Sequence, residues 1–285
     1  MPMLLIQGSF HVIGAQPDGD SLHFTPDDPT EWDLVQGRHR VRHNSAGTNQ
    51  LRLDAIDALE THYGPQRDHQ PLEFAHAAAA ELLAWLGFTD VRREPDETVV
   101  GAVPERVPGY ILTRDADLHG RCVALVGKGT PPAASGTTVV VDVPLLRTTV
   151  NHHLLATGLV YPTYYRNLFP DLRGEFTAAT LRARAAGSGL WSRDATTSGA
   201  EITGIPSITD DVVILPKLFR RLDDYLRLGD PSPAGFPAFL AQHPDRYFIL
   251  STGHSTTGLD FVVEVTDARY VRMTHPPEDL VFDEG

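Results

Sequence analysis

Three short charged segments hold the residues of this sequence that are best suited to chemistry. They are "PDGDS" at residues 17–21, "RLDAIDALE" at 52–60 and "DLHGR" at 117–121. Carboxylate oxygens bind hard divalent cations, a carboxylate can take a proton from water, and an arginine can bind a phosphate through two parallel hydrogen bonds. Together these groups could hydrolyse a phosphodiester. Each segment alone is a weak signal, since Asp-Gly-Asp is commonly a turn and clustered charges are commonly surface ion pairs.

The expected secondary structure places each segment at the end of a strand or in a turn. The sequence pattern predicts strands at 4–14, 20–24, 50–56, 107–114, 121–126, 137–143, 246–251, 259–265 and 269–273. It predicts helices at 74–88, 150–158, 174–191, 215–228 and 235–242, with a linker following Trp191. Because strand ends hold side chains on a rigid sheet, the three segments can meet in one site.

The order of these elements predicts a β-barrel with helices, which is an α+β fold. Residues 1–195 would form this barrel domain, and residues 196–285 would form a small C-terminal α/β accessory region. The accessory region has 7 basic and 14 acidic residues, so it is poorly suited to hold nucleic acid. We expect it to mediate homo-oligomerisation, to bind a protein partner or to restrain the site.

Strand alternation leaves open which aspartate accompanies Arg52. In a strand that continues through this segment, Arg52 and Asp54 lie on one face and Asp57 lies on the other. Asp57 can join Arg52 only if the strand ends before it and the chain turns. Glu60 would then lie beside Asp57, at the spacing of a helical turn. In that case Asp54 is a surface charge or supports the site from outside.

Six segments in the same order resemble the staphylococcal (thermonuclease-like) nuclease family. They are "DGDSLHF", "LRLDAIDALET", "YGPQ" with the alanine-rich helix after it, "DLHGRCVALV", "TTVNHHLLATGLVYPTYY" and "LRARAAGSGLW". The resemblance covers about residues 8 to 193. It implies an OB-fold, that is, a five-stranded barrel with three helices. It also implies a calcium-dependent endonuclease that hydrolyses DNA, with RNA as a further candidate substrate.

The resemblance implies a site for one Ca²⁺ ion, which other divalent cations could also fill. Asp20 and Asp57 would be its carboxylate ligands. The backbone carbonyl of Ala58 would add a third ligand. The family's spacing therefore selects Asp57, and not Asp54, as the partner of Arg52.

The resemblance also implies how a phosphodiester would be cut. Glu60 would be the general base that activates water, and Arg52 and Arg121 would clamp the phosphate and stabilise the charge that develops on it. In-line attack would expel the 5′ oxygen and leave a 3′-phosphate. Three departures from the family pattern spare these groups, and one of them is a longer loop before the opening strand, which carries a basic run. Leu59 stands where proline is common, and the chain has only two lysines, so arginine must replace the family's phosphate-binding lysines.

Further residues are candidates for contact with the substrate. Tyr161, Tyr164 and Tyr165 lie where the family places tyrosines against a bound nucleotide, and packing in the core is the alternative. The basic run "GRHRVRH" at 37–43 could attract phosphate or could simply be a solvated loop face. Its arginines are Arg38, Arg40 and Arg42.

Composition limits the class of protein. With 41% hydrophobic and 21% charged residues, the chain has the make-up of a soluble globular protein. No apolar run reaches the roughly 18 residues of a membrane span, and no secretory signal is expected, so we expect a cytoplasmic protein. The single cysteine, Cys122, excludes an internal disulfide and a multi-cysteine zinc site. The net charge of −13 argues against diffuse capture of nucleic acid.

Two functions therefore compete. The first is a cytoplasmic nuclease, with foreign DNA as one candidate target. The second is a catalytically silent barrel of the same family that binds nucleic acid or serves as a scaffold. The presence of all five catalytic-type residues (Asp20, Arg52, Asp57, Glu60 and Arg121) favours the first.

Overall fold

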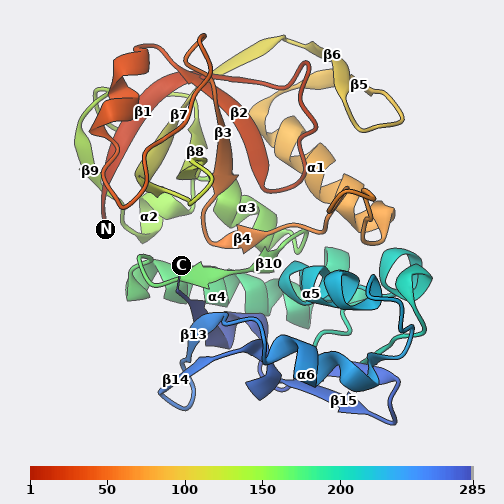
Figure 1. The fold of residues 1–285 in the computed structure, drawn as a ribbon. Helices are drawn as coiled ribbons and strands as arrows, with labels where there is room; N and C mark the ends of the chain where they lie inside the picture. Colours follow the sequence, from red (N-terminus) through yellow and green to blue (C-terminus); the bar gives the residue numbers. More distant parts are fainter. Residues whose placement is uncertain (284–285) are drawn as a thin grey trace.

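Five strands close into a β-barrel in the computed structural model, which describes residues 1–283 (Figure 1). The strands are β1 (Pro2–His11), β2 (Ser21–Pro26), β3 (Asn49–Leu53), β7 (Arg106–Ala116) and β8 (Cys122–Lys128). They pair in the order β1–β2–β3–β8–β7, and β7 pairs with β1 to close the barrel. The β3–β8 pair is parallel and the other four pairs are antiparallel. This confirms the expectation of a barrel carrying helices.

Alternating apolar side chains fill the barrel. The rings of Phe10 and Phe24 lie on neighbouring strands with their centroids 5.0 Å apart, and both are fully buried. Strand β8 is buried on both faces, because helices cover the outside of the barrel there. Cys122 lies in this strand, and burial raises the pKa of its thiol to about 12. The thiol therefore stays protonated and belongs to the core.

Four helices pack around the barrel: α1 (Leu72–Leu86), α2 (Val143–Leu146), α3 (Val150–Ala156) and α4 (Pro170–Ala185). Helix α1 ends near Gly87, as the sequence predicts. Gly87 has φ +107° and donates its N–H to the carbonyl of Leu83 at 3.1 Å. A residue with a Cβ rarely adopts this left-handed conformation, so glycine ends the helix here. Helix α4 begins earlier than expected, because Pro170 is favourable in the first turn of a helix.

The last third of the described chain contributes two α-helices and most strands of two small sheets. The helices are α5 (Pro216–Leu226) and α6 (Phe236–Leu240). One sheet contains β12 (Ala200–Glu201), β16 (Tyr270–Met273) and β15 (Val263–Thr266). The other contains β11 (Tyr164–Tyr165), β17 (Leu280–Phe282), β13 (Arg246–Ile249) and β14 (His254–Thr257). Strand β12 lies in the segment that was expected to be a linker.

The remaining elements are short. Strand β4 (Ile56–Asp57) pairs with β10 (Tyr161–Pro162), β5 (Thr89–Arg93) pairs with β6 (Val99–Val103), and β9 (Thr138–Val140) adds to β1. Short 3₁₀-helices lie at Pro29–Leu34, Gly189–Ser192, Pro233–Gly235, Leu259–Phe261 and Pro277–Asp279, and a short π-helix lies at Ser207–Asp211. The β5–β6 hairpin was not expected from the sequence.

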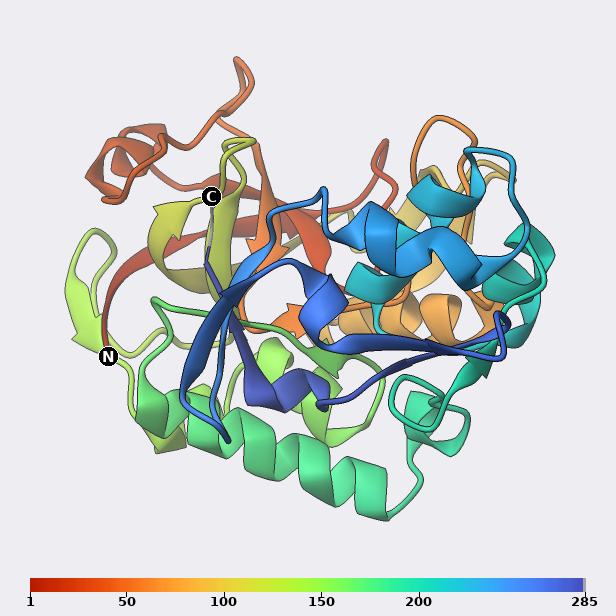
Figure 2. The same ribbon diagram turned by 60° about the horizontal axis from the view of Figure 1, so that its bottom comes forward.

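A second hydrophobic core joins the last third of the chain to the barrel region. Leu59 and Tyr161 from the first part of the chain pack in the same cluster as Phe219 and Leu222 of α5. Strand β17, at the end of the chain, pairs in parallel with β11. In Figure 1 the C-terminal elements lie below the barrel, with β4, β10 and α4 between the two, and Figure 2 shows α4 lengthwise. The boundary between residues 195 and 196 stays a prediction.

The helices of residues 1–283 include none with the length and apolar character that crossing a membrane would require. Localisation in the cytoplasm stays a prediction.

Asn151 fastens α3 to the barrel, and its loss should destabilise the fold. Its buried amide oxygen accepts from the N–H of Val126 at 3.0 Å, and its amide nitrogen donates to the carbonyls of Asp54 at 2.9 Å and Ala124 at 3.1 Å. Because Asn151→Ala leaves buried backbone groups unpaired, we expect the free energy of unfolding to fall by about 3 kcal/mol. Urea denaturation measures this. The control Asn167→Ala removes an exposed hydrogen bond to Asp115 and should have a much smaller effect; equal effects would contradict the prediction.

An ion-pair cluster on α4 should make stability depend on pH in acid. Arg147 donates to both carboxylate oxygens of Glu175 at 3.0 and 2.8 Å, and His152 lies 2.9 Å from one of them. These hydrogen bonds, Arg147 first, lower the pKa of Glu175 from 4.5 to about 2. The stabilisation is therefore complete above about pH 4.5 and is lost as the pH falls through about 2.

Glu175→Gln tests this cluster. The variant should be less stable than the wild type at pH 7, and the difference should shrink as the pH falls from about 4.5 toward about 2. Urea denaturation at several pH values measures the difference. Glu264→Gln, which breaks an exposed pair with Arg272, is the control and should have little effect at any pH. A Glu175→Gln difference that stays constant down to pH 2 would rule out the linkage.

Candidate functional site

The chain turns between Arg52 and Asp57, which settles how both can face one site. Strand β3 ends at Leu53, residues Asp54 and Ala55 form a turn, and Ala55 has a left-handed φ of +66°. Strand β4 then begins and pairs Asp57 with Tyr161. The turn breaks the two-residue alternation, so the strand predicted at 50–56 ends earlier than expected. As the sequence reasoning required, the strand ends before Asp57.

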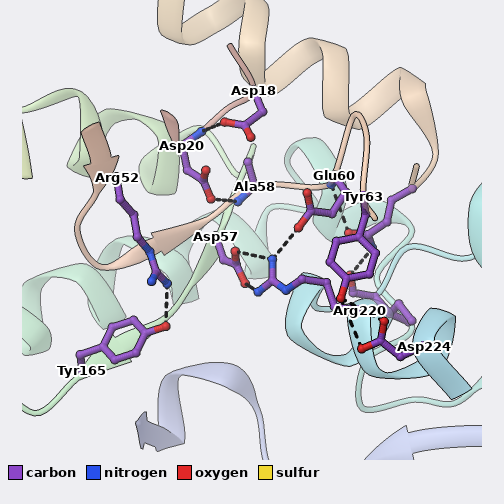
Figure 3. Close-up of polar contacts among 12 residues, drawn as sticks. Asp18, Asp20, Arg52, Asp57, Ala58, Glu60, Tyr63, Tyr165, Arg220 and Asp224 are labelled. Carbon is purple, nitrogen blue, oxygen red and sulfur yellow. Dashed lines mark hydrogen bonds and ion pairs between the residues drawn. The ribbon is translucent and has the colours of Figure 1, made fainter. Parts of the chain in front are cut away.

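A single cavity of about 390 Å³ gathers most of the residues singled out in the sequence (Figure 3). The predicted residues that line it are Asp20, Arg52, Asp57, Ala58, Glu60, Arg121 and Tyr165. The residues that sequence reasoning did not assign to the site are Asp18, Tyr63, His119, Lys217 and Arg220. The three charged segments therefore meet in space, although up to about 100 residues separate them in the chain.

The Asp-Gly-Asp turn brings two carboxylates to one wall of the cavity. Asp20 accepts a hydrogen bond from the N–H of Ala58 at 3.0 Å, and its own N–H donates to Asp18 at 3.2 Å. A Cβ on Gly19 would lie 2.6 Å from the Cβ of Ala78, so only glycine lets this turn approach α1 so closely. Burial and the neighbouring charges of Asp18 and Asp57 raise the pKa of Asp20 well above its usual range. This wall therefore holds carboxyl groups so close together that the charged form of Asp20 is disfavoured.

Arg52 extends into the cavity from the end of β3 and contacts Tyr165. Its Nη2 donates to the hydroxyl of Tyr165 at 2.6 Å, and its guanidinium lies 4.9 Å from the centre of that ring. Tyr165 is in β11, where it pairs with Phe282 of β17. The end of the chain therefore fixes the tyrosine that orients Arg52.

Arg121 is held by the turn that precedes β8. The carboxylate of Asp117 accepts hydrogen bonds from the N–H groups of His119 and Arg121, both at 2.9 Å, and from Arg121 Nε at 2.7 Å. Burial raises the pKa of Asp117, but the charge and hydrogen bonds of Arg121 lower it by more. The pKa of Asp117 therefore lies below its usual value. Asn49 ties this turn to β3, because it donates to the carbonyl of Gly120 and accepts from the N–H of Cys122, both at 2.9 Å. Arg121 is thus oriented by a rigid, buried support.

Arg220 of α5 occupies the space between two of the predicted carboxylates (Figure 3). Its Nη2 lies 2.9 Å and its Nη1 3.3 Å from the two oxygens of Asp57, and Nη1 also donates to Glu60 at 2.5 Å. Burial raises the pKa of Glu60 to about 7, although Arg220 acts in the opposite direction. Tyr63 supports the same helix by donating to Asp224 at 3.1 Å. This part of the site therefore comes from the C-terminal region.

Two of the tyrosines proposed for nucleotide contact are not available to a ligand in this structure. Tyr161 is fully buried and donates its hydroxyl hydrogen bond to Asp194 at 2.6 Å. Tyr164 is also fully buried, and its hydroxyl lies 3.0 Å from that of Thr177. Core packing, the alternative left open from the sequence, is what these two rings do, and Tyr165 alone of the three faces the cavity.

The basic run lies outside the cavity. Arg38, Arg40 and Arg42 are exposed and do not line it. Arg42 nevertheless adjoins the turn that carries Arg121, because its N–H donates to the carbonyl of Gly120 at 2.9 Å and its side chain covers that glycine. Direct contact between these arginines and a ligand stays a prediction.

The side chains of the cavity offer the type of ligand atom that a hard cation prefers, but they offer few of them. Asp20 and Asp57 offer carboxylate oxygens, and the crowding of Asp20 by Asp18 is a repulsion that a cation would relieve. Within residues 1–283, however, no three His, Cys, Asp or Glu side chains are arranged to hold a metal ion. Ca²⁺ takes six to eight oxygens, so water, phosphate oxygens and the carbonyl of Ala58 would have to complete the set.

Sequence reasoning missed Arg220 for a physical reason. Lys217, Arg220 and Asp224 share one face of α5 at helical spacing, but the same pattern occurs on any solvated helix face. Only the packing of α5 turns this face toward the cavity. Comparison with protein-family models gave no match, and comparison with curated proteins gave none either. The side chains of the cavity therefore carry the case for its function.

Proposed function

We propose that the cavity is the active site of a nuclease that hydrolyses phosphodiester bonds in DNA, with RNA as a further candidate substrate. The observation that carries the proposal is the meeting of Arg52, Arg121 and Glu60 with the Asp20–Asp57 pair around one cavity. Two arginines suit a phosphate, and the carboxylates suit a cation and a proton acceptor. This combination is the one that the sequence resemblance implies.

The strand order supports a barrel of the OB type. The order β1–β2–β3–β8–β7 with a parallel β3–β8 pair is a closed five-stranded arrangement with helices outside it. The candidate residues lie on one side of this barrel, at the ends of β3 and β8 and in the turn before β2. Barrels of this type commonly bind nucleic acid on such a face.

Each residue has a role in the proposed reaction. Arg52 and Arg121 bind the phosphate and stabilise the negative charge that grows on its oxygens during in-line attack. Glu60 takes a proton from the attacking water. Asp20, Asp57 and the carbonyl of Ala58 would hold Ca²⁺, which would polarise a phosphoryl oxygen. Tyr165 orients Arg52, and Asp117 orients Arg121.

Removing one arginine should nearly abolish cleavage without unfolding the protein. Arg121→Ala removes a contact that is strongest in the transition state, so we expect the cleavage rate to fall by about 10² to 10³-fold or more. Nicking of a supercoiled plasmid in millimolar calcium measures the rate, and thermal melting verifies the fold. Arg272→Ala, an exposed arginine of β16, is the control and should cut normally. Cleavage by Arg121→Ala at the control rate would refute the assignment.

Cation removal distinguishes a nuclease from a silent binding module. We expect a calcium chelator to stop plasmid cleavage and renewed calcium to restore it, because the cation would neutralise charge on the phosphate. Binding of a labelled oligonucleotide is measured in the same samples. Binding without cleavage under any divalent cation would favour the silent module, whereas neither binding nor cleavage would overturn both functions.

A further inference from the structure

The guanidinium of Arg220 is directed at the two carboxylates to which the proposed function gives separate tasks. Both oxygens of Asp57 lie within 3.3 Å of it, and one oxygen of Glu60 lies at 2.5 Å. Arg52 donates a hydrogen bond to the hydroxyl of Tyr165. Arg220 therefore acts on Asp57 and Glu60 themselves, and it stands where a cation bound by Asp57 would place its charge.

With Arg220 included, the basic side chains that line the cavity equal the acidic ones in number. The acidic residues that line it are Asp18, Asp20, Asp57 and Glu60, and the basic ones are Arg52, Arg121, Lys217 and Arg220. Arg121 is also paired with Asp117 and Lys217 with Asp245, whereas Arg220 is in direct contact with both Asp57 and Glu60. Removal of one guanidinium would leave the carboxylates in excess and strengthen the attraction for a cation.

The side chain of Arg220 can move although its helix is fixed. Phe219 and Leu222 of α5 are fully buried in the second core, so displacement of the helix would break that core. The Arg220 side chain is 27% exposed and borders the open cavity. Its flexible aliphatic stem allows the guanidinium to leave Asp57 while α5 stays in place.

We propose that Arg220 competes with the divalent cation for Asp57 and so sets the cation concentration that the site requires. This inference rests on the proposed function, since it takes Asp57 as a cation ligand. Cation binding and the Arg220–Asp57 contact exclude one another. By thermodynamic linkage, the contact weakens cation binding by the same factor by which cation binding weakens the contact, so loss of the contact strengthens cation binding.

Calorimetric titration with calcium alone tests the competition. Full-length Arg220→Gln should bind Ca²⁺ about tenfold or more tightly than the wild type. Arg221→Gln removes the same charge from the neighbouring position on α5, where the arginine pairs with Asp245 and does not line the cavity. This matched control should change the affinity by less than about threefold. Asp57→Asn should abolish binding in either background.

The outcomes separate this inference from the proposed function. Tighter binding by Arg220→Gln supports the competition. Equal affinities of the wild type and Arg220→Gln, both lost with Asp57→Asn, would leave the cation site in place and overturn the competition. Absence of calcium binding by every variant would overturn the cation assignment and the competition together. Plasmid cleavage by these proteins then reports on the proposed function separately.

A measurement on the wild type covers the case in which Arg220→Gln does not fold. The ¹⁵N resonance of the Arg220 side chain, assigned by its absence from Arg220→Lys, should shift as calcium is added and saturate with the calorimetric affinity. The Arg221 resonance should stay in place. An Arg220 signal that does not respond while calcium binds would overturn the competition.

Discussion

The balance of charge at Asp57 is the constraint on which the rest of the structure depends. Only 5% of this side chain is exposed, and Asp20 and Glu60 lie in the same cavity. A carboxylate with so little water is strongly destabilising unless a cation or several hydrogen-bond donors compensate it. Arg220 supplies that compensation from a position 163 residues further along the chain. A barrel that carried these acids alone would gain protons or lose stability.

This constraint explains why the C-terminal region packs against the barrel region at this place. The segment that carries the acids contributes to both cores, with Ile56 and Ala58 in the barrel core and Leu59 in the second core. Leu59 stands where the sequence resemblance would place a proline, and its fully buried side chain anchors the segment to the C-terminal core. Two apolar anchors on opposite sides hold Asp57 and Glu60 toward the cavity between them.

Local sequence signals were sufficient for the barrel and for the residues whose position follows from a strand end. Arg52, Asp57 and Arg121 line one cavity, and a strand end or tight turn fixes the position of each within a few residues. The tyrosines were harder, since aromatic rings in a short strand pattern suit packing and stacking equally well, and Tyr161 and Tyr164 proved to be core residues. Arg220 lay beyond local reasoning, because the packing of distant elements decides which face of α5 meets the cavity.

The environment of Asp20 is the structural feature that best distinguishes an enzyme from a silent module. A protein that keeps a charged cluster only for its fold gains from matching every carboxylate with a cation, as Arg220 matches Asp57 and Glu60. Asp20 instead accepts from the neutral N–H of Ala58 while Asp18 and Asp57 crowd it with like charge. Such an arrangement opposes stability, and proteins tend to keep local conflicts of this kind where a ligand resolves them. The conflict at Asp20 is therefore the feature of the cavity that most favours the proposed cation site over a silent module.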